Sequence, residues 1–158
     1  MTRKTMAFVA LLALALLVSQ GTALAALVLC KGGKCEGTQQ ADDLRGTVAK
    51  DQIFGLGVDD VVTASSSDDR VNGGDGRDTI FGEGGTDTLS GGPKGDRIVG
   101  GDDRDFIFGG SGSDVIDSAS DEGLGPVADD VDCDTGDDTV TADRLDNVAA
   151  NCERVTRV

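Results

Sequence analysis

The chain of 158 residues contains no His, Trp or Tyr, and only five Phe. Without His it lacks the side chain that most often acts as a general base. Its carboxylates are spread along the chain at a regular period rather than concentrated as a pair with perturbed pKa values in a cleft. We therefore expect no enzyme. So few aromatic residues with a high net charge are also typical of intrinsically disordered chains, and disorder stays open as an alternative.

Basic residues are scarce as well. Lys and Arg together number 14 against 29 Asp and Glu, which gives a formal net charge of -15. Phosphate backbones require clustered Lys and Arg, and so do anionic lipid surfaces. This composition argues against nucleic acid and against a basic membrane patch, and it favours cations as partners.

One long apolar run is present, close to the start of the chain. Arg3 and Lys4 precede thirteen apolar residues at 6–18, and Ala-Leu-Ala follows at residues 23–25. This order predicts a secretory signal peptide over 1–25. The alternative of an uncleaved anchor is weak because a bilayer needs about 20 residues. A lipid anchor at Cys30 is disfavoured by the bulky Leu before it. We expect a secreted, extracellular protein without a membrane span after cleavage.

The expected mature chain, residues 26–158, has the length of one domain. Removing the two basic residues of the leader takes the formal charge from -15 to -17. Stacked carboxylates would repel one another without a cation, and a small aliphatic core offers little to offset that repulsion. We therefore expect disorder without a bound cation and order with it.

Residues 37–117 divide into nine consecutive blocks of nine residues, each with Asp at its sixth position and an aliphatic residue at its eighth. The aspartates are Asp42, Asp51, Asp60, Asp69, Asp78, Asp87, Asp96, Asp105 and Asp114. The aliphatic residues are Leu44, Ile53, Val62, Val71, Ile80, Leu89, Ile98, Ile107 and Ile116. A fixed short period of this kind predicts a solenoid in which each block is one structural turn.

The clearest blocks, 73–81, 82–90 and 109–117, add glycines at or near the first, second and fourth positions. Glycine can adopt φ > 0, so we expect these turns to point carbonyl oxygens inward. Calcium takes six to eight oxygen ligands, more than one turn supplies, so two turns would share an ion. Residues seven to nine would be extended, with only the eighth pointing inward.

These blocks resemble the Gly-Gly-x-Gly-x-Asp-x-aliphatic-x nonapeptide of the RTX, or hemolysin-type, calcium-binding proteins. The resemblance implies an all-β fold, a right-handed parallel β-roll (a β-solenoid) with two blocks per coil. Calcium would then lie between one block and the block 18 residues on. Asp42, Asp60, Asp78, Asp96 and Asp114 would line one edge, and Asp51, Asp69, Asp87 and Asp105 the other.

The resemblance also ranks the sites. Calcium is expected first between 73–78 and 91–96, between 82–87 and 100–105, and between 91–96 and 109–114. The candidate ligands there are Asp78, Asp87, Asp96, Asp105, Asp114, Gly74, Gly76, Gly85, Gly92, Gly101, Gly110 and Gly112. Asp60, Asp69, Asp75 and Asp102 are weaker candidates. The four blocks that start at 37, 46, 55 and 64 lack most turn glycines and are expected to be packing repeats. Lys94 would compete with an ion unless it points outward.

The ends of the chain are expected to protect the roll, with an N-terminal cap over 26–36, a loop over 118–132 and a C-terminal cap over 133–158. The segment 131–155 resembles the C-terminal cap of small secreted actinobacterial calcium-repeat proteins. It holds one shifted block, 133–141, for which a further metal site at Asp137 and Asp138 is the alternative.

Four cysteines in a secreted chain allow three disulfide pairings. We favour Cys30 with Cys35 and Cys133 with Cys152, because each pair is local and brackets one end of the repeat. Zinc is disfavoured because the chain has no His and export favours oxidation.

The sequence thus predicts a secreted calcium-binding β-roll whose folding is coupled to extracellular Ca²⁺. The alternative is an extracellular adhesion or matrix protein in which calcium is only structural.

Overall fold

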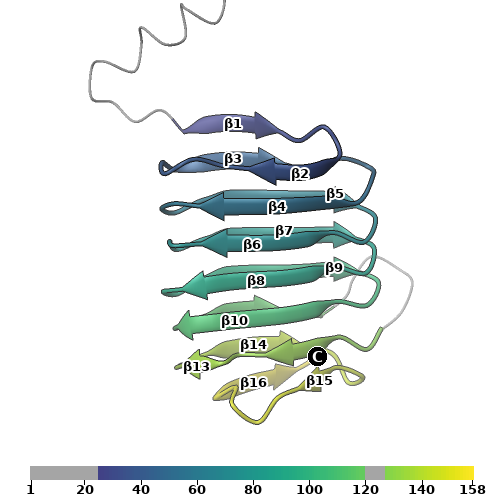
Figure 1. Cartoon of the computed structure of the whole chain (residues 1–158). Helices are drawn as coiled ribbons and strands as arrows, with labels where there is room; N and C mark the ends of the chain where they lie inside the picture. The colour runs from purple at the N-terminus through teal and green to yellow at the C-terminus, as the bar shows by residue number, and fades with distance from the viewer. Residues whose placement is uncertain (1–24, 120–126) are drawn as a thin grey trace, which may run out of the picture.

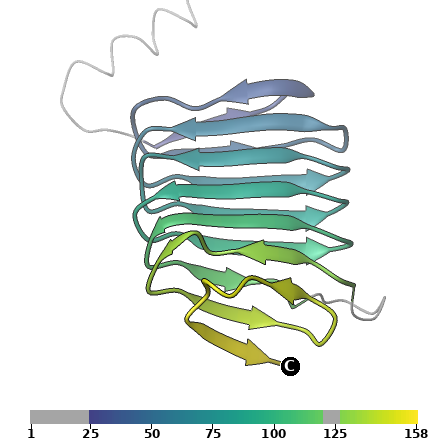
Figure 2. The ribbon, with the colours of Figure 1, turned by 60° about the horizontal axis from the view of Figure 1, so that its bottom comes forward.

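The computed structural model describes residues 25–119 and 127–158, so the predicted signal peptide lies outside the described residues except for Ala25. The described chain forms a flat stack of coils that passes alternately between two facing parallel sheets (Figures 1 and 2). No helix occurs in these two ranges. The predicted all-β parallel solenoid is confirmed.

Each coil contributes one strand to each sheet. The first sheet contains, in spatial order, β1 (Ala26–Leu29), β3 (Asp42–Arg45), β5 (Val61–Ser66), β7 (Thr79–Gly84), β9 (Arg97–Asp102), β11 (Val115–Asp117), β14 (Thr139–Ala142) and β16 (Arg154–Arg157). The second contains β2 (Gly33–Glu36), β4 (Asp51–Leu56), β6 (Arg70–Gly74), β8 (Thr88–Pro93), β10 (Phe106–Gly112), β12 (Asp130–Asp132) and β15 (Asn147–Val148), with β13 (Thr135–Gly136) also paired to β10.

Strand pairing follows the predicted step of 18 residues. Ile80 lies opposite Ile98, and Leu89 lies opposite Ile107. Beyond β11 the step lengthens, since Ile116 lies opposite Val140. The chain inserts residues after Asp117 and then returns to the same stacking, so the roll continues into the C-terminal segment.

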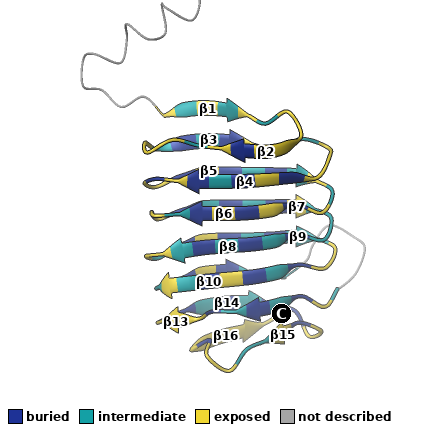
Figure 3. Ribbon diagram, viewed as in Figure 1, coloured by how far each residue is buried: buried dark blue, intermediate teal, exposed yellow. Residues whose placement is uncertain are grey.

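The core is a narrow stack of the eighth-position side chains. All nine aliphatic residues are buried, at 0–1 % exposure. Figure 3 shows buried and exposed residues alternating along the strands, as a two-residue side-chain period requires. Each of these side chains contributes roughly 1.5–3 kcal/mol through burial. The Asp-x-aliphatic pattern therefore sets both the coil length and the core.

Residues 26–36, predicted as an N-terminal cap, form β1 and β2, which continue the two sheets. Cys35 is buried opposite Ile53 and takes the inward place of an aliphatic residue. It is bonded to Cys30, as predicted.

The C-terminal segment also continues both sheets. The predicted loop over 118–132 is too long at its end, because β12 occupies Asp130–Asp132 and buries Val131 opposite Ile107. The predicted disulfide Cys133–Cys152 is present. Within the described ranges, no helix is long and apolar enough to cross a membrane.

Candidate metal centre

The sixth-position aspartates form two ladders, one along each edge of the solenoid. Each Asp begins a strand or immediately precedes one, and its backbone N–H donates to Oδ1 of the Asp one coil further along, at 2.7–2.8 Å through the regular repeats. The 18-residue step predicts this division. The first ladder runs through Asp42, Asp60, Asp78, Asp96, Asp114 and Asp138. The second runs through Asp51, Asp69, Asp87, Asp105, Asp129 and Asp146.

The other carboxylate oxygen is the unusual feature of these ladders. In one set of aspartates Oδ2 is buried and accepts no hydrogen bond from any described residue: Asp60, Asp69, Asp78, Asp87, Asp96, Asp105, Asp114, Asp129 and Asp138. These side chains are 0–3 % exposed. Buried polar atoms in folded proteins nearly always have a partner, and an ion is one explanation for those that do not. The unpaired oxygens of the ladders are therefore candidates for binding an ion that is not part of the protein.

Several of the unpaired oxygens lie beside a first-position glycine, in a space that a Cβ would fill. A Cβ added to Gly73 would lie 2.4 Å from Asp78 Oδ2 and 2.7 Å from the carbonyl oxygen of Gly91. At Gly91 the corresponding distances are 2.4 Å to Asp96 Oδ2 and 2.6 Å to the carbonyl oxygen of Gly109. A carboxylate oxygen and a carbonyl oxygen from the next coil thus converge at both of these glycines.

The expected reason for glycine at the first position was wrong, because these residues are not left-handed. Space, not φ, favours glycine there, and the fully buried Ala64 is the exception among the nine blocks. Gly76 behaves the same way, since its added Cβ would meet Asp78 Oδ1 and the Val58 backbone, each at 2.7 Å.

The other candidate glycines adopt the predicted left-handed backbone. Gly74, Gly85, Gly92, Gly101 and Gly110 have φ between 103° and 118°. A Cβ on Gly110 would lie 2.1 Å from the Gly92 carbonyl oxygen, so the turns stack with their carbonyls closely apposed. Gly112 has φ 145°.

Several residues with side chains share this conformation. Ser65, Ser67, Glu83, Lys94 and Asp103 occupy second or fourth positions and have φ between 71° and 92°. This conformation costs roughly 1–2 kcal/mol for a residue with a Cβ. Stacking of the coils therefore imposes it. The block at 64–72 was expected to be a packing repeat without a calcium site. Its Ser65 and Ser67 nevertheless have positive φ, as residues of the glycine-rich turns do.

The first two of the nine blocks differ from the other seven. Thr38 donates its backbone N–H (2.6 Å) and its hydroxyl (3.0 Å) to Asp42 Oδ2. Thr47 does the same for Asp51 Oδ2, at 2.7 and 2.9 Å. The oxygen that is unpaired elsewhere is satisfied here by the protein itself, and in Asp42 and Asp51 the buried oxygen without a partner is Oδ1.

Burial raises the pKa of the ladder carboxyls. Loss of solvation is the largest cause, the backbone hydrogen bond opposes it, and neighbouring carboxylates add to it. The pKa rises to about 6 for Asp60 and Asp69, to about 7 for Asp87, Asp96 and Asp129, and to about 8 for Asp105. It is also raised for Asp78 and Asp114. The ladders are thus costly to charge without a cation.

The protein's own cations form no ion pair with the ladder aspartates in the described residues. Its ion pairs within the described residues join Lys34 to Glu36, Arg45 to Asp43, Lys50 to Asp68, Arg104 to Asp130 and Arg154 to Asp137. None includes a ladder aspartate.

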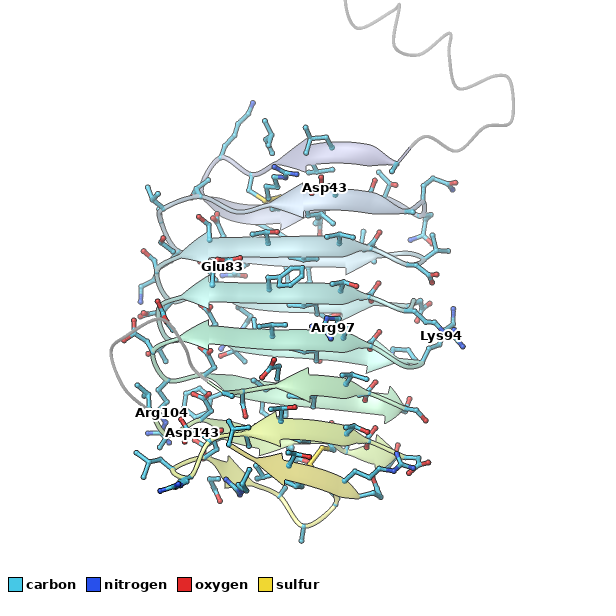
Figure 4. All side chains as sticks on the ribbon, turned by 180° about the vertical axis from the view of Figure 1, so that it is seen from behind. Asp43, Glu83, Lys94, Arg97, Arg104 and Asp143 are labelled. Atoms are coloured by element: carbon cyan, nitrogen blue, oxygen red, sulfur yellow. A yellow bond between two sulfur atoms is a disulfide. The ribbon has the colours of Figure 1, made fainter. Side chains whose placement is uncertain are left out.

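Lys94 is exposed and extends away from its turn, at the edge opposite Glu83 (Figure 4). The condition set for this lysine, that it point outward, is met. The two weaker candidates outside the ladders, Asp75 and Asp102, are exposed and half-buried respectively.

The ladders extend past the regular repeats through residues that the nine-residue period misses. Asp129, Asp146 and Glu153 were not predicted as ladder members, and Asp138 was only an alternative. The N–H of Asp138 donates to Glu153 Oε2 at 2.9 Å. The pattern acidic-x-Val recurs at all four positions, so it, rather than the period, was the signal that could have found them.

The donor set determines which ions fit. Within the described ranges, no three His, Cys, Asp or Glu side chains converge as a metal cluster. Each edge instead offers one carboxylate per turn beside backbone carbonyls, an all-oxygen set. Hard cations with high coordination numbers, calcium above all, suit such a set. The residues therefore fit calcium shared between successive coils.

A comparison with protein families agrees with this geometry. The model described as RTX calcium-binding nonapeptide repeat (4 copies) matches residues 54–89 and 90–123. No curated protein and no solved structure gives a significant match.

Proposed function

Because the chain carries RTX calcium-binding nonapeptide repeats, we propose that it is a secreted calcium-binding β-roll whose folding is coupled to extracellular calcium. The observation that carries this proposal is the row of buried Oδ2 atoms without hydrogen-bond partners, from Asp60 to Asp138. Calcium would neutralise these carboxylates and complete their coordination.

The chain's own residues prepare the sites. Each ladder hydrogen bond fixes one carboxylate oxygen, so the other is held at the turn without further ordering. Left-handed glycines bring carbonyls of successive coils together. A site that needs two coils cannot exist in the unfolded chain, so binding free energy becomes folding free energy.

The proposed location has two supports. Residues 1–25 have the pattern of a secretory signal peptide. The two disulfides are typical of an oxidising compartment. Extracellular modules bind calcium at roughly 10⁻⁴–10⁻³ M, so the chain would stay loose during export and order outside. We propose no catalytic activity, since the chain has no His.

Circular dichroism and hydrodynamic radius of residues 26–158 test this function. With chelator we expect little ordered structure and an expanded chain, and with millimolar calcium a β signal and a compact one. Magnesium at the same concentration is the control, because it demands a smaller octahedral site. Spectra and radius that do not change with calcium would refute the proposal.

A further inference from the structure

The last regular turn of the roll, residues 109–114, stacks on residues 133–138 of the C-terminal segment. We call this contact the roll–cap joint. Asp114 N–H donates to Asp138 Oδ1 at 2.8 Å, and Ser111 pairs with Thr135 between β10 and β13. The step across the joint is 24 residues instead of 18. Residues 133–138 also lie beyond residue 123, where the matched repeats end.

Two oxygens converge at the joint as they do within the roll. A Cβ added to Gly109 would lie 2.6 Å from Asp114 Oδ2 and 3.0 Å from the carbonyl oxygen of Cys133. The equivalent point at Gly91 has Asp96 Oδ2 and the carbonyl oxygen of Gly109. The Cys133 carbonyl therefore occupies the place that a glycine carbonyl has in the repeats.

Two buried carboxylates at the joint have an oxygen without a partner. Asp114 is 1 % exposed and Asp138 is 0 % exposed. Oδ2 of each accepts no hydrogen bond from the described residues. The nearby Asp137 is different: it is exposed and paired with Arg154.

We propose that the roll–cap joint is a further calcium site, built from Asp114, Asp138 and the Cys133 carbonyl, and that it couples calcium to the Cys133–Cys152 disulfide. This inference rests on the proposed function. The ion would hold the Cys133 backbone against the roll, and the disulfide would hold the same backbone in the cap. Cys133 is 0 % and Cys152 is 9 % exposed, so opening of the joint would give a reductant freer access to the disulfide.

The rate of disulfide reduction measures this opening. Residues 26–158 would be treated with a thiol reductant at several calcium concentrations, alkylated, and mapped by mass spectrometry. Calcium at about 100 times its dissociation constant should slow reduction of Cys133–Cys152 by about 100-fold, because binding suppresses opening by that factor. The Cys30–Cys35 bond, at the far end of the roll, reports the effect of calcium on folding as a whole, so only slowing of Cys133–Cys152 beyond it counts for the joint.

Asp138→Asn isolates the joint. Asn keeps an oxygen that accepts the Asp114 N–H but loses the charge, and Asp137→Asn is the matched exposed control. With circular dichroism confirming that both variants fold in calcium, Asp138→Asn should speed reduction of Cys133–Cys152 about tenfold or more and leave Cys30–Cys35 unchanged. Equal rates in the two variants would overturn the joint site.

Wild-type protein gives a second test that does not depend on the folding of a variant. Coupling is reciprocal, so selective reduction and alkylation of Cys133–Cys152 should remove one calcium ion from the calorimetric stoichiometry. An unchanged stoichiometry would overturn the inference while leaving the proposed function intact. Absence of any calcium binding by the oxidised wild type would instead refute the proposed function, and the inference with it.

Discussion

Asp42 and Asp51, in the first two turns, have Oδ2 held by Thr38 and Thr47, whereas Asp60 to Asp114 have Oδ2 buried without a partner. Both regions keep the same coil and the same inward aliphatic residue. The Asp-x-aliphatic pattern is therefore common to both regions, and the partners of Oδ2 distinguish them. The surroundings of one carboxylate oxygen then decide where a cation is needed. Four experiments would break or sharpen this contrast.

The largest difference is expected between aspartates of the two regions. Replacing Asp78 and Asp96 with Ala should weaken the affected calcium steps by at least about 100-fold, since even outer-shell changes at metal sites cost 10–100-fold. Asp42→Ala should leave those steps nearly unchanged, because its Oδ2 is already held by Thr38. Calcium titration calorimetry measures the affinity of each variant. Equal losses of calcium affinity would contradict the distinction between the two regions.

Replacing a turn glycine should have the next largest effect, on the stability of the calcium-bound roll. Gly110→Ala places a Cβ 2.1 Å from the Gly92 carbonyl at φ 106°, and should cost about 2 kcal/mol or more of stability in calcium. Gly84→Ala is the matched control, because nothing lies within 4 Å of its added Cβ. It should change stability by less than about 0.5 kcal/mol. Urea unfolding at fixed calcium measures both, and a neutral Gly110→Ala would contradict the stacked-carbonyl geometry.

Acid should partly replace calcium. Asp96 and Asp105 have folded-state pKa values of about 7 and about 8, above the ordinary value of 3.8. At pH values between the ordinary pKa and these raised pKa values, the folded metal-free chain binds more protons than the unfolded chain. Its stability therefore falls as pH rises through this range. In chelator, the β signal should be stronger near pH 5 than near pH 8. A metal-free signal that grows with pH would show that the ladder carboxyls are not the destabilising groups.

The smallest effect concerns side chains forced into the left-handed conformation. Lys94→Gly should stabilise the calcium-bound roll by about 0.5–1 kcal/mol, since it removes strain of roughly 1–2 kcal/mol and adds some chain entropy. Arg97→Gly is the comparison, because Arg97 lies in β9 with an ordinary backbone, and it should destabilise. Thermal unfolding in calcium shows whether each variant is more or less stable than the wild type. A destabilising Lys94→Gly would mean that the lysine is not strained.

Most of the fold was predictable because one short pattern carries it. Asp and the aliphatic residue two positions later fix the coil, and Ile53 or Ile98 could be placed in the core from their position in the block alone. The continuation through Asp129 and Asp138 was not predictable from the period, because an insertion after Asp117 changes the step. The site was predictable only in outline. That Thr38 occupies an oxygen of Asp42 is a local contact between the second and sixth positions of one block, which the Asp-x-aliphatic pattern does not include. That Ser65 adopts a glycine-like turn depends on stacking between coils rather than on the local sequence.

Calcium titration calorimetry on residues 26–158 tests the central claim most directly. If the unpaired carboxylate oxygens are calcium ligands, the chain should take up about three or more ions at the roughly 10⁻⁴–10⁻³ M affinity of extracellular modules, with β structure appearing in step. No heat of calcium binding, with the same spectrum in calcium and in chelator, would contradict it.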